Sequence, residues 1–120
     1  MRKFKTHLMS LLNLLFKSQA SNDVINRLSR EEFKTKIAGK KIQLVDVRTA
    51  GEFQMGHIKS ALNLDFFNQT AFRSGVEKLK KEEAVYVYCR SGNRSQSAAG
   101  LMAKMGFTEI YDLKNGYMNW

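Results

Sequence analysis

Runs of β-branched and aromatic residues alternate along this chain with segments whose apolar residues recur at helical spacing. Short apolar runs bounded by turn residues predict β-strands, and apolar residues three and four positions apart predict helices that pack on a sheet. The predicted strands span residues 24–28, 41–47, 60–64, 85–88 and 108–113. The predicted helices span residues 29–39, 49–56, 65–76, 77–83 and 95–106, with a final short helix from residue 115. This alternation indicates an α/β domain whose mostly parallel sheet is covered by helices on both faces.

Capping residues set the predicted starts of three of these helices. Ser29 followed by Glu32 forms a capping box, and Gly39 is expected to end that helix. Thr49 and Asp65 are expected to cap the next two helices, because their side chains can accept hydrogen bonds from first-turn N–H groups.

The only cysteine of the chain, Cys89, directly follows the fourth predicted strand, and a helical pattern begins six residues later. Unpaired N–H groups at a helix N-terminus and nearby guanidinium groups both stabilise a thiolate. Arg90 and Arg94 flank this loop, while Gly92 and Asn93 tolerate the backbone angles that let it curl and turn its N–H groups inward. The pattern therefore predicts a reactive thiolate instead of an inert buried cysteine.

The loop Cys89-Arg90-Ser91-Gly92-Asn93-Arg94-Ser95 resembles the active-site loop of the rhodanese family, whose members are sulfurtransferases that carry a sulfane sulfur as a cysteine persulfide. Other segments follow in the family's order, namely Leu44-Val45-Asp46-Val47-Arg48, Gly56-His57-Ile58, Ala61-Leu62-Asn63, Gly106-Phe107, Tyr111-Asp112-Leu113 and Asn115-Gly116. The resemblance covers about residues 23 to 120. It implies a single rhodanese-like domain with a five-stranded sheet and Cys89 as the catalytic nucleophile.

The loop after the cysteine supplies the expected substrate-binding residues, which are Arg90, Ser91, Gly92, Asn93, Arg94 and Ser95. Their N–H groups would hold the terminal sulfur, the two arginines would bind the charged end of the donor, and Ser95 would cap the helix or hydrogen-bond the sulfur. Four residues separate Cys89 from Arg94. Phosphatases that share the rhodanese fold place five there, which makes room for a tetrahedral phosphate, so the shorter loop favours sulfur transfer.

Asp46, Arg48 and His57 are further candidates near the same edge of the sheet, where the carboxyl ends of parallel strands meet and ligands bind. One interpretation is that these residues form the rim of the pocket around Cys89 and adjust the electrostatic field in it. The other is structural: Asp46 and Arg48 would form a network with Glu52, and His57 would be hydrogen-bonded at a turn. A negative Asp46 would repel an anionic donor, which favours the structural interpretation.

Composition narrows the function classes further. The 120 residues, 43% hydrophobic and 26% charged, fit one globular domain. A single cysteine excludes an internal disulfide, and two distant histidines give no metal-ligand cluster, so we expect neither a metal nor a cofactor. A net charge of +9 suits attraction of small anions. Basic residues alternate with acidic ones and form no stripe with aromatics, so nucleic acid is not an expected partner.

Residues 1–20 form a separate predicted segment ahead of the domain at 21–120. Its four basic residues leave +5 of the net charge of +9 on the rest of the chain. An amphipathic helix over residues 1–17 is predicted from the helical spacing of Phe4, Leu8, Leu11, Leu12 and Leu15. Three roles stay open: packing on the domain or a partner, contact with an anionic membrane surface, or a cleaved export signal. We expect a cytoplasmic protein, with export or peripheral membrane attachment as the alternative.

These features together predict a single-domain sulfurtransferase. It would move a sulfane sulfur from thiosulfate or a persulfide donor to a thiol or cyanide, through a persulfide on Cys89. The expected partners are a small anionic sulfur donor and a thiol acceptor, either a small molecule or a protein. The alternative is a persulfide-carrying or redox-signalling module that acts on a protein partner and turns over thiosulfate poorly. The oligomeric state stays open.

Overall fold

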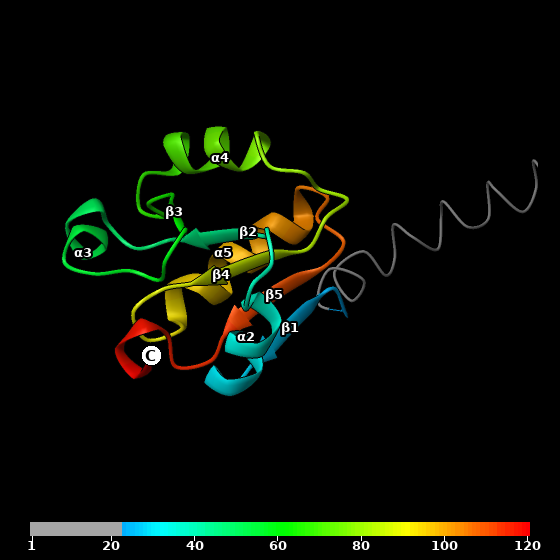
Figure 1. Ribbon diagram of the computed structural model, residues 1–120. Helices are drawn as coiled ribbons and strands as arrows, with labels where there is room; N and C mark the ends of the chain where they lie inside the picture. The colour runs from blue at the N-terminus through cyan, green and yellow to red at the C-terminus, as the bar shows by residue number, and fades with distance from the viewer. Residues whose placement is uncertain (1–22) are drawn as a thin grey trace, which may run out of the picture.

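The computed structural model describes residues 23–120, which form one five-stranded sheet in the order β1-β5-β4-β2-β3 (Figure 1). Every neighbouring pair of these strands is parallel, and β1 and β3 are the two edges. The strands are β1 (Ile25–Leu28), β2 (Gln43–Asp46), β3 (Leu62–Asn63), β4 (Val85–Tyr88) and β5 (Ile110–Leu113). The predicted α/β class and its parallel sheet are confirmed.

The helices cover both faces of this sheet. They are α2 (Arg30–Ile37), α3 (Ala50–Gln54), α4 (Gln69–Glu77) and α5 (Asn93–Lys104), followed by the 3-10 helix η1 (Tyr117–Asn119). Successive side chains of the central strand β4 point to opposite faces, as the pleat requires. Val85 and Val87 join a core with α4 and α5, whereas Tyr86 and Tyr88 join a second core that includes Phe33 of α2. Because β4 is buried on both faces, its carboxyl end is a fixed point on which a site can be built.

Two of the three predicted helix caps are confirmed. Ser29 and Glu32 form the predicted capping box of α2, and Thr49 forms a second capping box with Glu52 at the start of α3. Asp65 was expected to cap the next helix, and this prediction is wrong. Its Oδ1 accepts a hydrogen bond from Phe67 N at 2.9 Å in a turn before the helix.

Three helices differ from the sequence prediction in their start or in their existence. α4 begins later, at Gln69, with Asn68 as its N-cap, and the predicted helix over 77–83 is absent because the chain turns there after Glu77. α5 begins at Asn93, two residues before the predicted start at Ser95, so the loop after Cys89 is tighter than the apolar pattern indicated. The helix start is polar, and hydrophobic periodicity does not detect such a turn.

The predicted amphipathic helix over residues 1–17 lies outside the described residues. Among residues 23–120, none of the helices has the length and apolar character needed to cross a lipid bilayer.

Candidate active site

Cys89 lies in the tight loop between β4 and α5, as the sequence predicts. The residue is 1% exposed, yet its sulfur faces polar groups of the loop. Sγ accepts a hydrogen bond from Gly92 N at 3.0 Å and donates one to Ser95 Oγ at 3.5 Å. The sulfur is therefore held by the backbone and by a side chain of the same loop, directly at the start of α5.

Gly92 gives the loop its shape. Its φ of +107° is a left-handed conformation that residues with a side chain rarely adopt. A Cβ on Gly92 would lie 2.9 Å from Arg27 Nη2, the far end of a flexible side chain, and at an ordinary contact distance of 3.5 Å from Asn115 N, so the backbone conformation is the main reason for glycine here. Gly92 is the N-cap of α5 and supplies no side-chain acceptor, which leaves first-turn N–H groups of the helix for an anion in the loop.

Ser95 contacts the sulfur and does not cap the helix. It is the third residue of α5 and is fully buried, and its Oγ donates to the carbonyl oxygen of Gly92 at 3.2 Å. Of the two roles expected for Ser95, the structure therefore places its hydroxyl in the second, beside Cys89 Sγ.

The two arginines of the loop have different surroundings. Arg94 is bound by Glu52 of α3 in two parallel contacts, Nη1 to Oε1 at 2.7 Å and Nη2 to Oε2 at 2.9 Å. These hydrogen bonds lower the pKa of Glu52 to about 2, more than partial burial raises it. Arg90 is exposed and forms no ion pair within residues 23–120. Both arginines were expected to bind the anionic sulfur donor. Of the two, Arg94 is bound by a carboxylate and Arg90 is not, within residues 23–120.

Ser91 and Asn93 lie on the outside of the loop. Both are exposed, and neither side chain makes a hydrogen bond within the described part of the chain. Any contribution they make to binding would come from their backbone N–H groups.

Replacement of Glu52 by Gln tests whether this ion pair holds the loop. The change is expected to lower the free energy of unfolding at pH 7 by about 1 kcal/mol, because a partly exposed pair contributes less than a buried one. The native pKa of Glu52 lies below its ordinary value of 4.5, so the stabilisation is present above that pH and lost as the pH falls toward 2. Urea unfolding at pH 7 and pH 3 measures both effects. The exposed Glu82→Gln change is the control, and an equal loss in the two variants would contradict the prediction.

Asp46 and Arg48 form a buried ion pair. Arg48 Nη2 lies 2.7 Å from Asp46 Oδ2, and the same atom donates to the carbonyl oxygen of Gly56 at 2.7 Å. The guanidinium also lies 4.5 Å from the ring centre of Tyr117. The structural interpretation fits these contacts, with one correction: Glu52 pairs with Arg94 and Thr49 and is not part of this network.

His57 is also engaged within its own turn. Its Nδ1 lies 2.8 Å from the carbonyl oxygen of Phe53, and its ring stacks on the Phe53 ring at 3.5 Å between centres. These contacts fit the structural interpretation of His57.

The C-terminal segment holds the backbone of the loop, which the sequence analysis missed. Tyr117 N donates to the carbonyl oxygen of Cys89 at 2.8 Å, and Met118 N donates to that of Arg90 at 3.0 Å. Gly116 packs so closely that a Cβ there would overlap the carbonyl of Arg90. The Asn115-Gly116 segment was visible in the sequence, but its packing against the loop joins parts of the chain that are distant in sequence, and no local pattern indicates it.

A buried carboxyl group, Asp112, lies near the loop. It is fully buried near the end of β5, and neither of its oxygens has a hydrogen-bond partner of acceptable geometry among residues 23–120. Arg27 Nε is 3.4 Å from Oδ2. Burial raises the pKa of Asp112 to about 6, although Ser95 and Arg27 are near enough to act in the opposite direction. Sequence reasoning treated Asp112 only as part of a strand, since nothing local marks it as unpaired.

Residues 29–120 match the family model of the Rhodanese-like domain. The chain belongs to the rhodanese-like domain family.

Three relatives of this rhodanese-like domain differ in name and length. Uncharacterized protein YqhL of Bacillus subtilis is 38% identical over 98 residues, which cover 81% of this chain and 73% of YqhL. Thiosulfate sulfurtransferase GlpE of Coxiella burnetii is 37% identical over 79 residues, covering 66% of this chain and 71% of GlpE. A tRNA uridine(34) hydroxylase of Pelagibacter ubique is 29% identical over 101 residues, but the match spans 84% of this chain and only 34% of the hydroxylase.

Among solved structures, the human single-domain sulfurtransferase TSTD1 superposes with a TM-score of 0.66 and 26% identity, covering 78% of this chain and 93% of that one. The family and these relatives support a sulfur-transfer type of function, of the sulfurtransferase kind.

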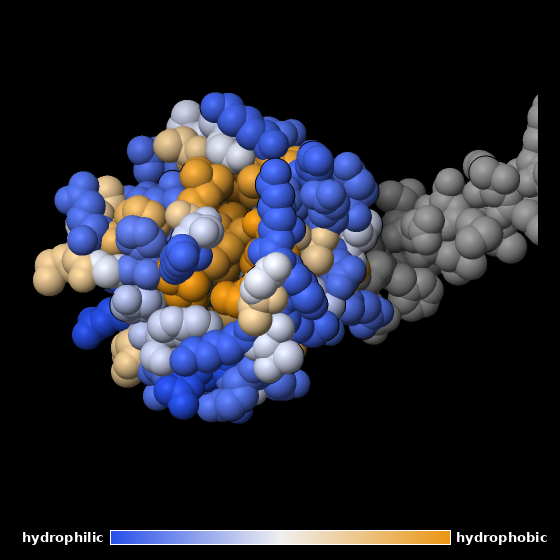
Figure 2. Space-filling view, in the orientation of Figure 1, coloured by the Kyte–Doolittle hydropathy of each residue, from blue (hydrophilic) through white to orange (hydrophobic). Residues whose placement is uncertain are grey.

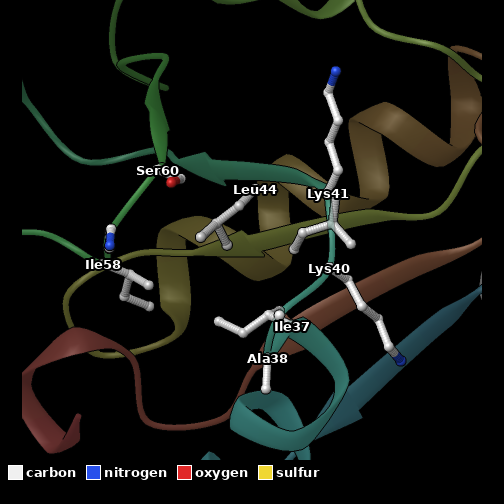
Figure 3. A pocket seen from close by; sticks show the side chains of 10 residues that line it. Ile37, Ala38, Lys40, Lys41, Leu44, Ile58 and Ser60 are labelled. Carbon is white, nitrogen blue, oxygen red and sulfur yellow. The ribbon is translucent and has the colours of Figure 1, made fainter.

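Two grooves of the rhodanese-like domain differ in their relation to Cys89. A groove of about 300 Å³ adjoins the loop and is lined by Arg48, Gly51, Glu52, Met55, Arg90, Tyr117 and Met118. A wider one of about 450 Å³ lies between the end of α2 and the start of β2, and Ile37, Leu44 and Ile58 point toward one another across it (Figure 3). No residue of the loop 89–95 lines the wider groove, so of these two grooves only the smaller one adjoins the loop that holds Cys89.

Proposed function

We propose that this protein is a sulfurtransferase that moves a sulfane sulfur from thiosulfate or a persulfide donor to a thiol or cyanide, through a persulfide on Cys89. The observation that supports this most directly is the hydrogen bond from Gly92 N to Cys89 Sγ at 3.0 Å, at the N-terminus of α5. In this proposal the sulfur so placed acts as the nucleophile, and the four residues between Cys89 and Arg94 make a loop of the length expected for one terminal sulfur atom.

The reaction divides into two displacements. The Cys89 thiol first loses its proton to solvent. The thiolate then attacks the sulfane sulfur of thiosulfate, a new S–S bond forms, and sulfite leaves with the electron pair of the bond that breaks. In the second step the acceptor, a thiolate or cyanide, attacks the outer sulfur, and Cys89 leaves as a thiolate. This is covalent catalysis of the ping-pong type.

Groups around the loop have separate tasks in this proposal. The first-turn N–H groups of α5 stabilise the anionic terminal sulfur, because a helix N-terminus carries partial positive charge. Arg90 attracts the negative donor. Glu52 binds Arg94, and η1 binds the carbonyl groups of Cys89 and Arg90. Both contacts keep the N–H groups of the loop in place during the reaction.

Intact-mass measurement tests the proposal. Incubation with thiosulfate is expected to add the mass of one sulfur atom to the protein, and cyanide is expected to remove it. Cys89→Ser should show no addition, with a circular dichroism spectrum like that of the wild type. A wild-type protein that gains no sulfur from thiosulfate or from glutathione persulfide would contradict the proposal.

One observation favours the alternative, a persulfide carrier that serves a protein partner. Cys89 is 1% exposed, so its sulfur offers little surface to a small molecule in solution. Arg94 is already bound to Glu52, so fewer free cations at the loop attract a small anion. Steady-state assays with thiosulfate and cyanide separate the two functions. Many turnovers per protein molecule would support the enzyme, whereas one stoichiometric transfer that stops at the Cys89 persulfide would support the carrier.

A further inference from the structure

Exposed apolar side chains gather around the loop that holds Cys89. Residues 23–120 contain four large apolar residues with strongly exposed side chains: Met55 at 90%, Met118 at 70%, Phe67 at 67% and Leu62 at 47%. The first two line the groove beside the loop, together with Arg90 and Glu52. Leu62, in the edge strand β3, is not among the residues that line this groove. Single exposed apolar residues scattered over a surface are ordinary, whereas a group of them in one place marks an interaction site. Three of these four residues lie close to the loop that holds Cys89, which indicates such a site there.

Three separate elements supply this cluster. Met55 ends α3, Met118 lies in η1, and Phe67 precedes α4. α3 and the C-terminus lie at the same end of the sheet in Figure 1, and apolar atoms reach the surface at that end in Figure 2. The Phe67 ring lies 5.1 Å from the guanidinium of Arg94, which Glu52 binds. The apolar side chains thus stand on both sides of the Glu52–Arg94 ion pair, at the loop.

The charges at this surface are unequal. Arg48 and Arg94 are paired with Asp46 and Glu52, respectively, so their charges are largely compensated. Arg90 lines the groove and has no carboxylate partner within residues 23–120. A partner that fits this surface would bring apolar side chains for the methionines and a carboxylate for Arg90.

We propose that the sulfur partner of this site is a protein segment that presents a cysteine persulfide or thiol between apolar side chains and next to an acidic residue, docked on Met55, Phe67 and Met118. This inference rests on the proposed function, since it names the substrate class of the same site. Thiosulfate is small and strongly hydrated and gains nothing from exposed methionine, whereas a peptide removes that apolar surface from water. Flexible methionine side chains adapt to partners of different shape.

Persulfidated tetrapeptides test the proposal on the full chain. The probes are phenylalanyl-cysteinyl-leucyl-glutamate and its counterpart with glycine on both sides of the cysteine, each with blocked ends. The apolar peptide is expected to load Cys89 with a kcat/KM at least about tenfold higher, because its two side chains bury apolar area that glycine lacks. Replacing its glutamate with lysine should lower kcat/KM by about threefold at low salt, as expected for one exposed charge pair.

Variants locate the effect. Met55→Gln combined with Met118→Gln keeps the side chains unbranched but polar, and it is expected to bring the ratio between the two peptides close to one. Leu62→Gln changes an exposed leucine of the edge strand β3 and should leave the tenfold ratio intact.

Several results would overturn the inference. Equal rates for the two peptides would overturn the docking surface while leaving sulfur transfer standing. Failure of both peptides and of thiosulfate to load Cys89 would overturn the proposed function as well. A wild-type dimer in sedimentation experiments that the double methionine variant dissociates would show that a second copy occupies the surface, which would also overturn it.

Discussion

Gly116→Ala is expected to lower the rate of sulfur transfer about a hundredfold and to destabilise the protein strongly. A Cβ at this position would overlap the carbonyl group of Arg90 and lie 2.7 Å from the carbonyl oxygen of Cys89. Both obstacles are backbone atoms and cannot rotate away. Gly116 also has φ +65° and ψ −166°, a conformation that is essentially restricted to glycine. Backbone strain and overpacking together are expected to cost about 3 kcal/mol or more.

The loss of activity follows from the same contacts. To relieve the overlap, η1 must move away from the loop and give up the hydrogen bonds from Tyr117 N and Met118 N to the carbonyls of Cys89 and Arg90. A displacement of about 1 Å in a reacting group can lower a rate about a hundredfold. Sulfur transfer rate and urea unfolding measure the two effects. The fluorescence of Trp120, the single tryptophan, reports the movement, since its ring packs 6.0 Å from that of Phe33.

Two other glycines are matched controls for this prediction. Gly39 has nearly the same φ, +64°, but no atom of the described residues near the position of a Cβ, so Gly39→Ala isolates the effect of φ and should cost about 1 kcal/mol without loss of activity. Gly100 lies inside α5, and no atom of residues 23–120 would contact a Cβ there, so Gly100→Ala should stabilise the helix by about 0.5 to 1 kcal/mol. If Gly116→Ala behaved like Gly39→Ala, the close packing of η1 on the loop would not matter.

Asp112→Asn is expected to stabilise the protein by about 2 to 3 kcal/mol at pH 7.5, since each unit of pKa shift corresponds to about 1.4 kcal/mol. The carboxyl is fully buried, its oxygens lack hydrogen-bond partners in the described part of the chain, and burial raises its pKa from 3.8 to about 6. A neutral amide of the same shape avoids the cost of keeping a charge there. Urea unfolding at neutral and acidic pH measures the gain.

The pH dependence of the stability gained by Asp112→Asn shows whether the buried charge of Asp112 causes it. Because the native pKa of Asp112 exceeds the ordinary value of 3.8, the native state binds the proton more tightly than the unfolded state does. Its contribution to stability is therefore fully present below pH 3.8 and is lost as the pH rises through about 6. The advantage of Asp112→Asn should vanish at pH 3.5. Asp23→Asn, at an exposed position, should change stability little at either pH.

A different result would assign Asp112 another role. If Asp112→Asn lost stability at pH 7.5, the attraction between the carboxylate and Arg27, 3.4 Å away, would outweigh the cost of burial. The charge would then help to hold β1 against β5, whose residues 27 and 112 are register partners.

The main features of the fold and the position of Cys89 in the loop between β4 and α5 could be predicted from the sequence. Strand β4 could be recognised because its four residues are buried on both faces and are therefore all apolar or aromatic. Cys89 could be singled out because it follows that strand and precedes Gly92 and a polar helix start, which are local features. The capping boxes at Ser29 and Thr49 are local as well, since each involves residues three positions apart.

Tertiary structure alone decided which groups surround the sulfur and which charges remain free. The partner of Arg94 is Glu52, 42 positions away, and the segment that fixes the carbonyl of Cys89 begins at Gly116. Within residues 23–120, Asp112 has no hydrogen-bond partner, because the strands on both sides of it bury its oxygens without offering a donor of suitable geometry. Periodicity and capping describe neighbours along the chain, whereas ion pairs, close backbone packing and burial depend on contacts between distant segments. Those contacts exist only once the sheet has formed.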